Sequence, residues 1–365
     1  MENLEVTKLF GSAYKGKTVL VTGDTGFKGT WLCYWLIKMG AKVVGYSIDD
    51  ITHPSHHKLL KINYKSYRGD ICDTKKLTGV IKKHKPQIVF HLAAQSLVRE
   101  SYRAPIETYQ TNVVGTLSVF EAVRNANCVK AIVNVTTDKV YENLETNRPY
   151  NEQDRLGGYD LYSSSKACVE ILSDSYKRSF FQNSKVLLAT VRAGNVIGGG
   201  DWAKDRLIPD IVKTTIKGKT TLIRSPKSIR PWQHVLEPLS GYLLLGQKLL
   251  EGKQEYVGAW NFGPETNQCV TVGEVLKLFK QNWSKLKFEY NKSDKMKFHE
   301  AGILMLDYKK AKTKLKWQPV WKLDFTVAIT ANWYKNYYTG KYLNTEQDLF
   351  QYIKDAKRRK LTWTK

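Results

Sequence analysis

Short runs of apolar residues alternate, in the first half of the chain, with longer segments in which apolar residues recur every three or four positions. The short runs are rich in Val, Ile and Leu and have strand length, whereas the longer segments have the spacing of helices that bury one face. The predicted strands are 17–22, 42–46, 87–92, 131–136 and 186–191, and the predicted helices are 30–39, 74–83, 111–124 and 162–181. This alternation predicts the α/β class, with a parallel sheet covered by helices on both faces.

The pattern changes at Gly198-Gly199-Gly200-Asp201, after which the segments are shorter, mixed and rich in Trp and Tyr. We therefore expect a first domain over 16–197 and a smaller mixed α/β lobe over 198–365. A segment near 235–263 is expected to return to the first domain, with a strand at 259–263. Residues 1 to about 15 look like a leader without regular structure.

The composition is that of a globular protein with an unusual excess of positive charge. Of 365 residues, 42% are hydrophobic and 25% are charged, and the formal net charge is +24. Lys is spread along the whole length, and only 354–360 forms a local basic run. We interpret the excess as a solvated surface that also attracts anionic ligands, and we expect no nucleic-acid partner.

The five cysteines are scattered, without a CxxC motif or Cys/His ligand spacing. This usage is typical of a reducing compartment, and it predicts neither a disulfide framework nor a metal site. No uncharged run approaches 18 residues, so we expect no membrane segment, and a cytoplasmic location is the default.

A glycine triplet links the first predicted strand to the first predicted helix. Gly23, Gly26 and Gly29 permit a tight turn, the close approach of a pyrophosphate, and close packing of the helix on the strand. The helix N-terminus adds N–H donors for the phosphates. This placement predicts a Rossmann-like, doubly wound fold that binds a dinucleotide, with contacts from Gly23, Thr25, Gly26, Phe27 and Gly29.

The end of the second predicted strand bears on the choice between NAD and NADP. Ser47 stands where an acidic residue would hold the ribose hydroxyls of NAD, and Asp49 lies about 20 residues beyond Gly29. No Arg follows that would bind a ribose phosphate, although Lys28 is nearby. We favour NAD over NADP.

Tyr162 and Lys166 are four residues apart in a predicted helix and therefore share one face. The Lys charge is expected to lower the Tyr pKa from its usual value of about 10 toward a working value. The hydroxyl of Thr137 can share the same substrate oxygen. Asp138 and Lys139 add an acid and a possible base beside that Thr. Hydride transfer alone does not need such a pair, so it indicates elimination.

These residues resemble the extended short-chain dehydrogenase/reductase family, the NAD-dependent epimerases and dehydratases. Further shared motifs are Gly69-Asp70-Ile71, His91-Leu92-Ala93-Ala94-Gln95 and Thr111-Asn112-Val113. Within that family, the longer segments 26–29, 157–160, 192–202 and 230–235 resemble the CDP-D-glucose 4,6-dehydratases. The matching motifs run from about 16 to 264.

The resemblance implies conversion of CDP-D-glucose to CDP-4-dehydro-6-deoxy-D-glucose and water. The implied route is oxidation at C4 by enzyme-bound NAD, loss of water across C5 and C6, and return of the hydride to C6. It would be an early step of deoxysugar biosynthesis for surface polysaccharide such as lipopolysaccharide O-antigen, with the smaller lobe binding the nucleotide sugar. Residues implied at the cofactor are Asp70, Ile71, Leu92, Ala93, Ala94, Asn112, Tyr162 and Lys166, and residues implied at the substrate are Gln95, Ser96, Arg192, Asn195, Arg206, Arg230, Gln233 and His234.

Five residues would carry the implied chemistry. Tyr162 would take the proton of the C4 hydroxyl, Lys166 would hold the Tyr pKa down and bind the cofactor ribose, and Thr137 would position the sugar oxygen. Asp138 would protonate the departing C6 hydroxyl, which requires burial to raise its pKa. Lys139 is favoured as the base at C5, and the alternative of a protonated Lys139 that stabilises the enolate stays open.

Two other functions have to be weighed. A 4,6-dehydratase or epimerase of another nucleotide sugar would have the same fold, but an epimerase needs no acid–base pair beside the Thr. A nucleic-acid-binding or scaffold protein is suggested only by the net charge, and the intact catalytic triad argues against it. The resemblance also implies a homodimer, in which helices 111–124 and 162–181 of each subunit form a four-helix contact.

Overall fold

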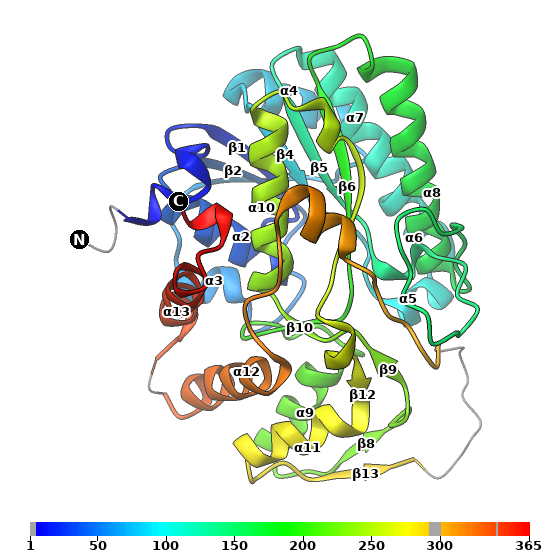
Figure 1. Cartoon of the computed structure of the whole chain (residues 1–365), viewed down its shortest axis with the longest axis vertical. Helices are drawn as coiled ribbons and strands as arrows, with labels where there is room; N and C mark the ends of the chain where they lie inside the picture. Colours follow the sequence, from blue (N-terminus) through cyan, green and yellow to red (C-terminus); the bar gives the residue numbers. More distant parts are fainter. Residues whose placement is uncertain (1–4, 292–300, 341) are drawn as a thin grey trace.

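The computed structural model describes residues 5–291, 301–340 and 342–365, and its centre is a parallel sheet (Figure 1). Seven strands follow the order β11-β6-β5-β4-β1-β2-β3, and every neighbouring pair is parallel. The strands are β1 (Thr18–Thr22), β2 (Lys42–Ser47), β3 (Lys65–Arg68), β4 (Ile88–His91), β5 (Ala131–Val135), β6 (Leu187–Ala193) and β11 (Gly258–Phe262). Each strand expected from the sequence is present, and the segment expected at 259–263 forms the edge strand β11.

Successive residues of a strand pack on opposite faces of the sheet. In β1, Val19 and Val21 belong to one buried cluster, whereas Leu20 belongs to another. The first cluster lies against α2 (Phe27–Lys38) and α10 (Leu236–Leu250), and the second lies against α4 (Thr74–His84), α7 (Gly115–Ala126) and α8 (Leu161–Tyr176). Helices therefore cover both faces, and the predicted doubly wound α/β fold is confirmed.

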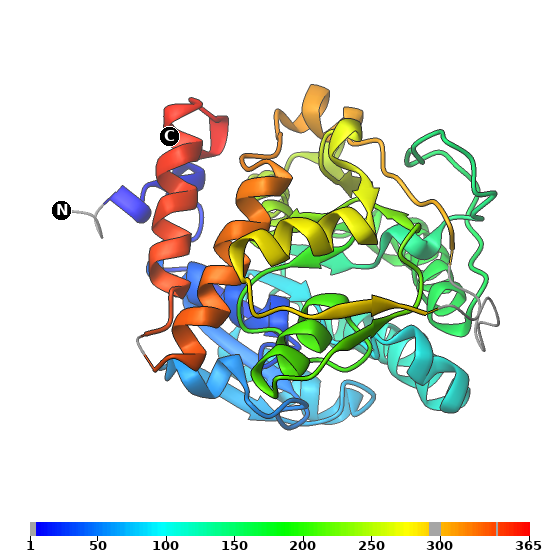
Figure 2. The same cartoon turned by 90° about the horizontal axis from the view of Figure 1, so that it is seen from below.

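A third buried cluster forms a smaller lobe below the sheet (Figures 1 and 2). Its core is rich in aromatic side chains, including Trp202, Trp232 and Trp333. The lobe contains α9 (Leu207–Ile216), α11 (Val272–Asn282) and α12 (Leu323–Tyr338), and the strand pairs β7 (Val196–Ile197) with β10 (Gln233–His234), β8 (Thr221–Ile223) with β13 (Phe288–Tyr290), and β9 (Ile229–Arg230) with β12 (Val270–Thr271).

The division of the chain into two domains stays a proposal. In this proposal the returning segment near 235–263 contains α10 and β11, whose buried residues join the core of the large sheet. The rest of 198–365 is assigned to the smaller lobe, which contains α9, α11 and α12. The buried residues of α13 (Thr345–Arg358) pack in the core of the large sheet although the proposal assigns this helix to the smaller lobe.

The two ends of the chain pack together (Figure 1). The ring of Phe10 stacks on Trp363 with centroids 5.2 Å apart, and the Gly11 N–H donates to the Lys365 carbonyl at 3.2 Å. Tyr14 is only 1% exposed. The expectation of an irregular leader is therefore wrong for residues 5–15, because the apolar side chains of that segment belong to the same buried cluster as those of α2.

The parallel strands place their carboxyl ends at one edge of the sheet, next to the smaller lobe (Figure 1). Residues at or just beyond five strand ends line one cavity there: Gly23, Ser47, Leu92, Thr136 and Ala193. The short helices α3 (His56–Leu60), α5 (Val98–Arg103) and α6 (Pro105–Tyr109) follow β2 and β4. In open α/β sheets this edge is where ligands bind, so the fold itself defines the position of the site.

Candidate active site

A cavity of about 900 Å³ opens between the carboxyl edge of the sheet and the smaller lobe. It extends from the glycine loop after β1, past the loops after β2, β4 and β5, to residues 221–225 of the smaller lobe. Its volume falls within the range of small-molecule and cofactor sites, about 300–1,000 Å³. The predicted catalytic residues all line it: Thr137, Asp138, Lys139, Tyr162 and Lys166.

The glycine loop has a shape that only glycine permits at two positions. Gly23 has a φ of +73°, and a Cβ there would lie 2.7 Å from the Ala93 nitrogen. A Cβ on Gly29 would lie 2.0 Å from the Gly23 carbonyl oxygen. The helix α2 then begins at Phe27 with Gly26 as its N-cap, so no capping side chain covers its first N–H groups. The loop therefore fits a pyrophosphate held by backbone N–H groups and the positive end of the helix.

Residues near the ends of β2 and β3 line the half of the cavity next to the glycine loop. Ser47, Asp49, Asp70 and Ile71 all line it, and the Ser47 hydroxyl lies 3.1 Å from the Thr25 hydroxyl. Leu92, Ala93 and Ala94 line the cavity beside the glycine loop.

Asn112 is expected at the cofactor but does not line the cavity. Its amide donates to the Ser165 hydroxyl at 2.9 Å and to the Gln95 carbonyl at 3.0 Å, and its carbonyl oxygen accepts from the Gln95 N–H at 2.9 Å. These bonds tie the loop after β4 to the helix α8. We conclude that Asn112 holds the wall of the cavity in place.

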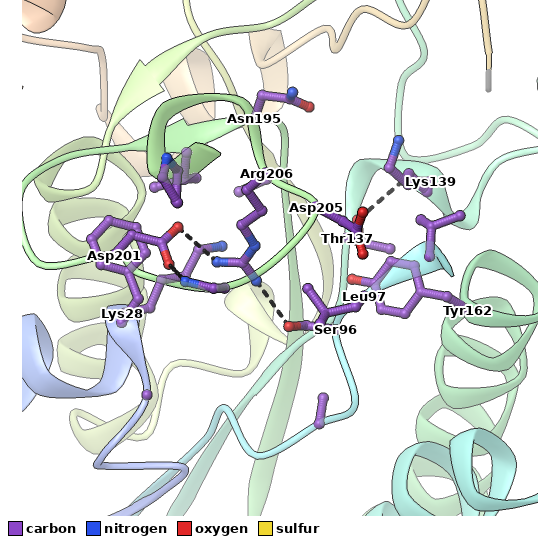
Figure 3. A pocket seen from close by; sticks show the side chains of 18 of the residues that line it. Lys28, Ser96, Leu97, Thr137, Lys139, Tyr162, Asn195, Asp201, Asp205 and Arg206 are labelled. Atoms are coloured by element: carbon purple, nitrogen blue, oxygen red, sulfur yellow. Dashed lines mark hydrogen bonds and ion pairs between the residues drawn. The ribbon is translucent and has the colours of Figure 1, made fainter. Parts of the chain in front are cut away.

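The catalytic side chains come from two neighbouring elements. Thr137, Asp138 and Lys139 lie just beyond β5, whereas Tyr162 and Lys166 lie in the first turns of α8. Figure 3 shows Thr137, Lys139 and Tyr162 on one side of the cavity. The helix begins there because Asp160 caps it, accepting the Ser163 N–H at 2.9 Å and the Ser163 hydroxyl at 2.6 Å. The structure thus brings the predicted set together.

The expected lowering of the Tyr162 pKa is wrong. Burial raises the pKa of Tyr162 to about 12, against opposing effects of Thr137 and Arg206. The Lys166 ammonium donates to the Val135 carbonyl at 3.1 Å. Burial and the charge of Lys28 lower the pKa of Lys166 to about 8. The raised pKa favours the neutral phenol.

Asp138 has the environment that a general acid needs. The side chain is 2% exposed, and burial raises its pKa although Lys139 and Thr137 act in the opposite direction. The Thr137 hydroxyl donates to Oδ1 at 3.0 Å, whereas Oδ2 has no hydrogen-bond partner among the described residues. Because the carboxyl group lines the cavity, a proton on Oδ2 can be donated to a ligand.

Arg192 is expected at the substrate, but its side chain lies in a buried network behind the cavity wall. It donates to both carboxylate oxygens of Glu170 at 2.9 Å and to the Tyr141 hydroxyl at 2.8 Å. Glu170 also accepts from the hydroxyls of Thr136 and Thr190. The network fixes the end of β5 on α8, and so it orients the residues that follow Thr136.

The other predicted substrate residues divide into two groups. Ser96, Asn195, Arg206 and Arg230 line the cavity, whereas Gln95, Gln233 and His234 do not. The Gln233 amide donates to the Phe262 carbonyl at 2.9 Å. These three side chains face the protein instead, because their partners or neighbours are loop hydroxyls, backbone carbonyls and tryptophan rings.

Two arginines of the first group already have protein partners. Arg206 donates to the Asp201 carboxylate at 3.0 Å and to the Ser96 hydroxyl at 2.9 Å (Figure 3). Arg230 donates to the carbonyls of Ile229 at 2.8 Å and Gly302 at 3.3 Å. These partners orient the two guanidinium groups at the cavity wall.

Sequence reasoning missed Glu170 and Asp201, the two acids that position arginines around this cavity. A signal for Glu170 was available, since it lies four residues after Lys166 and therefore on the same face of α8. Asp201 was visible only as part of a glycine-rich break.

The described residues can also be assessed for a metal site and for a membrane-spanning helix. Within residues 5–291, 301–340 and 342–365, no group of three or more His, Cys, Asp or Glu side chains is placed to hold a metal ion. In the same part of the chain, no helix combines the length and the apolar character needed to cross a bilayer.

Comparisons with known proteins agree with this geometry. A family model described as GDP-mannose 4,6 dehydratase matches residues 20–330. The CDP-glucose 4,6-dehydratase of Salmonella typhimurium is 46% identical over 335 residues, which cover 90% of this chain and 93% of that protein.

Solved structures share the fold. The epimerase Mth375 of Methanothermobacter thermautotrophicus superposes with a TM-score of 0.78 at 23% identity, covering 92% of this chain and 96% of the other. The dTDP-glucose 4,6-dehydratase of Bacillus anthracis, in complex with NAD, gives 0.74 at 24% identity, covering 88% and 97%. On the family match and the similarity to the Salmonella protein, the chain belongs to the GDP-mannose 4,6 dehydratase family.

Proposed function

We propose that the chain is an NAD-dependent hydro-lyase that converts CDP-D-glucose to CDP-4-dehydro-6-deoxy-D-glucose and water. The observation that carries this proposal is the placement of Asp138 and Lys139 beside Thr137 and Tyr162 in the cavity. An acid and a base at the reacting sugar are what a dehydration needs. The choice of CDP-glucose rests on the 46% identity to the Salmonella enzyme and on the long motifs that the sequence shares with that group.

The residues of the cavity fit a nicotinamide dinucleotide. The glycine loop and the start of α2 would hold its pyrophosphate, and Asp70 and Ile71 would lie at its adenosine end. Asp49 at that end disfavours the ribose phosphate of NADP, since the two charges are alike. When bound, NAD supplies a hydride acceptor that can also return the hydride.

Tyr162 is the proposed base for the C4 hydroxyl, with Thr137 beside it. Burial raises its pKa to about 12, which favours the neutral phenol. Arg206, across the cavity, lowers the Tyr162 pKa, and Lys166 lies one turn away on the same helix as a second cation for the phenolate. Tyr162 would then accept the C4 proton and hold it at its own oxygen.

Asp138 is the proposed acid for the C6 hydroxyl. Its unpartnered Oδ2 carries the proton that leaves with the hydroxyl as water. Lys139, the next residue, is the proposed base at C5 and must be neutral to act. A protonated Asp138 makes this easier, because it places no negative charge beside the Lys139 amine.

The substrate is proposed to lie along the second half of the cavity. Ser96, Asn195, Arg206 and Arg230 would contact it, and the two guanidinium groups suit a diphosphate. Gln95, Arg192, Gln233 and His234 would support these contacts from behind the wall.

We also propose a homodimer that forms through α7 and α8. Apolar side chains are exposed on and next to these helices: Val114 at 46%, Leu117 at 36%, Ile171 at 59% and Phe180 at 46%. A second copy of the same surface would bury them. Leu117→Glu together with Ile171→Glu should halve the mass measured by sedimentation, whereas a dimer that persists would exclude this surface.

A cytoplasmic location and a role early in deoxysugar biosynthesis for surface polysaccharide complete the proposal. All five cysteines are free thiols, as expected in a reducing compartment.

The test is to incubate the purified chain with NAD and, separately, with CDP-, GDP-, UDP- and dTDP-glucose. Mass spectrometry should show the loss of one water from CDP-glucose alone. Loss of water from another nucleotide sugar alone would change the substrate, and a product of unchanged mass would favour an epimerase.

A further inference from the structure

Lys28 is a cation in the cavity that forms no ion pair with the described residues. It is the second residue of α2 and lines the cavity (Figure 3). Among the residues that the structure describes, its ammonium has no hydrogen bond and no ion pair. Sequence reasoning considered Lys28 only as a residue near a ribose phosphate.

The charge of Lys28 is unfavourable for the folded chain. A cation in the first turn of a helix opposes the helix dipole, whose positive end lies there. Burial and the nearby charge of Arg206 lower the pKa of Lys28 to about 8, against an opposing effect of Asp138. Lys28 in turn disfavours the charged form of Lys166. Arg206, Lys166 and the N-terminus of α2 all disfavour a positive charge at this position, so stability of the fold does not explain the ammonium group.

The surroundings of Lys28 identify the end of the cavity that it faces. The charged groups that act on it are Arg206 and Asp138, which lie where the sugar is expected to react. Ser47 and Asp49, at the adenosine end, are not among these groups. Lys28 therefore does not favour NADP.

We propose that the Lys28 ammonium binds an oxygen of a diphosphate that enters this cavity. This rests on the proposed function, because two ligands of that function carry a diphosphate: the dinucleotide and the nucleotide sugar. Either one would supply an anionic partner that Lys28 does not have among the described residues. Arg206 and Lys28 would then hold the same anionic ligand from two elements, the smaller lobe and α2.

The test compares Lys28→Met and Lys28→Arg with Lys75→Met. Lys75 is the matched control, since it is the second residue of α4 but is exposed. Binding of NAD and of CDP is measured separately by calorimetry, and thermal unfolding is measured without ligand. Wild-type binding of CDP is checked first, because its absence would count against the proposed function rather than against Lys28.

Lys28→Met should unfold at the wild-type temperature or above it, because it removes a charge that opposes the helix dipole. Its affinity should fall about 10- to 100-fold, the range for a lost charge-assisted hydrogen bond. A fall for CDP assigns Lys28 to the nucleotide sugar, and a fall for NAD assigns it to the dinucleotide. Lys28→Arg should retain most of the affinity, and Lys75→Met should bind both ligands normally.

Three results would overturn the proposal. Lys28→Met could bind both NAD and CDP as tightly as the wild type. It could lose only turnover, which would mean that Lys28 acts on the sugar and not on a diphosphate. It could unfold at a lower temperature and lose both ligands together, which would mean a structural role.

Discussion

The Thr137 hydroxyl donates to Oδ1 of Asp138 at 3.0 Å and leaves Oδ2 without a partner among the described residues. One oxygen of the carboxyl group is thus fixed by the neighbouring side chain, and the other is left for a proton. Burial favours the protonated form by raising the Asp138 pKa. Thr137, which is proposed to position the sugar oxygen, would therefore also orient the proposed acid.

Asp138→Asn keeps the size of the side chain and removes the acid. We expect turnover of CDP-glucose to fall about 10²- to 10⁴-fold, the usual contribution of general acid–base catalysis. The nicotinamide absorbance of the reduced cofactor should still appear in a single turnover, because oxidation at C4 does not use Asp138. Asp174→Asn, on the exposed side of α8, serves as the control. A variant that still loses water at the wild-type rate would remove Asp138 from the mechanism.

Lys139 is tested by three replacements that separate a base from a positive charge. If Lys139 removes the C5 proton, Lys139→Glu should keep measurable turnover, whereas Lys139→Arg and Lys139→Met should lose it. Arg keeps the charge but cannot give up its proton in this range. The opposite order, with Arg active and Glu the least active, would show that Lys139 stabilises the enolate instead.

Arg192 is expected to act on stability. Arg192→Met leaves the Glu170 carboxylate buried without its cation, which should cost about 3–5 kcal/mol of unfolding free energy. Arg192→Met combined with Glu170→Leu should recover much of this loss, since no unpaired charge remains. Arg178→Met breaks an exposed pair with Asp174 and should change stability by about 0–1 kcal/mol. Denaturant unfolding measures all of these.

One outcome would instead support the expectation that Arg192 contacts the substrate. If Arg192→Met kept its stability and only raised KM for CDP-glucose, Arg192 would contact the substrate after all.

His234 should contribute to acid unfolding. Burial lowers its pKa to about 3, whereas an unfolded His titrates near 6.5. Between these values His234 binds a proton in the unfolded chain but not in the folded chain. The contribution of His234 to the free energy of unfolding is therefore fully present above about pH 6.5 and is lost as the pH falls toward 3. Each such group adds a slope of about 1.4 kcal/mol per pH unit.

His234→Asn should flatten the pH dependence of unfolding by that slope. Asn can still accept the Leu236 N–H that His234 Nδ1 accepts at 3.3 Å. Loss of ring packing against Trp31 and Trp321 lowers stability equally at every pH, so it leaves the slope unchanged. Parallel curves for the variant and the wild type would mean that His234 is already protonated in the fold.

Patterns along the chain were sufficient for six of the seven strands of the sheet, all but the edge strand β3, and for the residues at strand ends. The strand β1 and the loop after it could be predicted because alternation sets the two faces of a strand, and because Gly23 and Gly29 occupy positions where a Cβ would collide. The positions of Thr137 and Tyr162 could be predicted for a related reason. Residues that follow parallel strands, or that begin the next helix, lie at the same edge of the sheet.

Pairings between distant segments could not be predicted from such patterns. Arg192 and Glu170 are 22 residues apart on different elements, so a motif containing Arg192 did not reveal its partner. Lys166 shares a face with Tyr162, but its ammonium meets the carbonyl of Val135, 31 residues away. Phe10 was assigned to a leader because its partner, Trp363, is at the other end of the chain.

The most direct test of the account follows one hydrogen atom. CDP-glucose deuterated at C4 is incubated with the protein and NAD, and the product is examined by mass spectrometry and NMR. The account predicts a product that has lost one water and carries the deuterium at C6, because the hydride taken from C4 is returned to C6. Deuterium found again at C4 in a product of unchanged mass, or lost entirely to solvent, would contradict it.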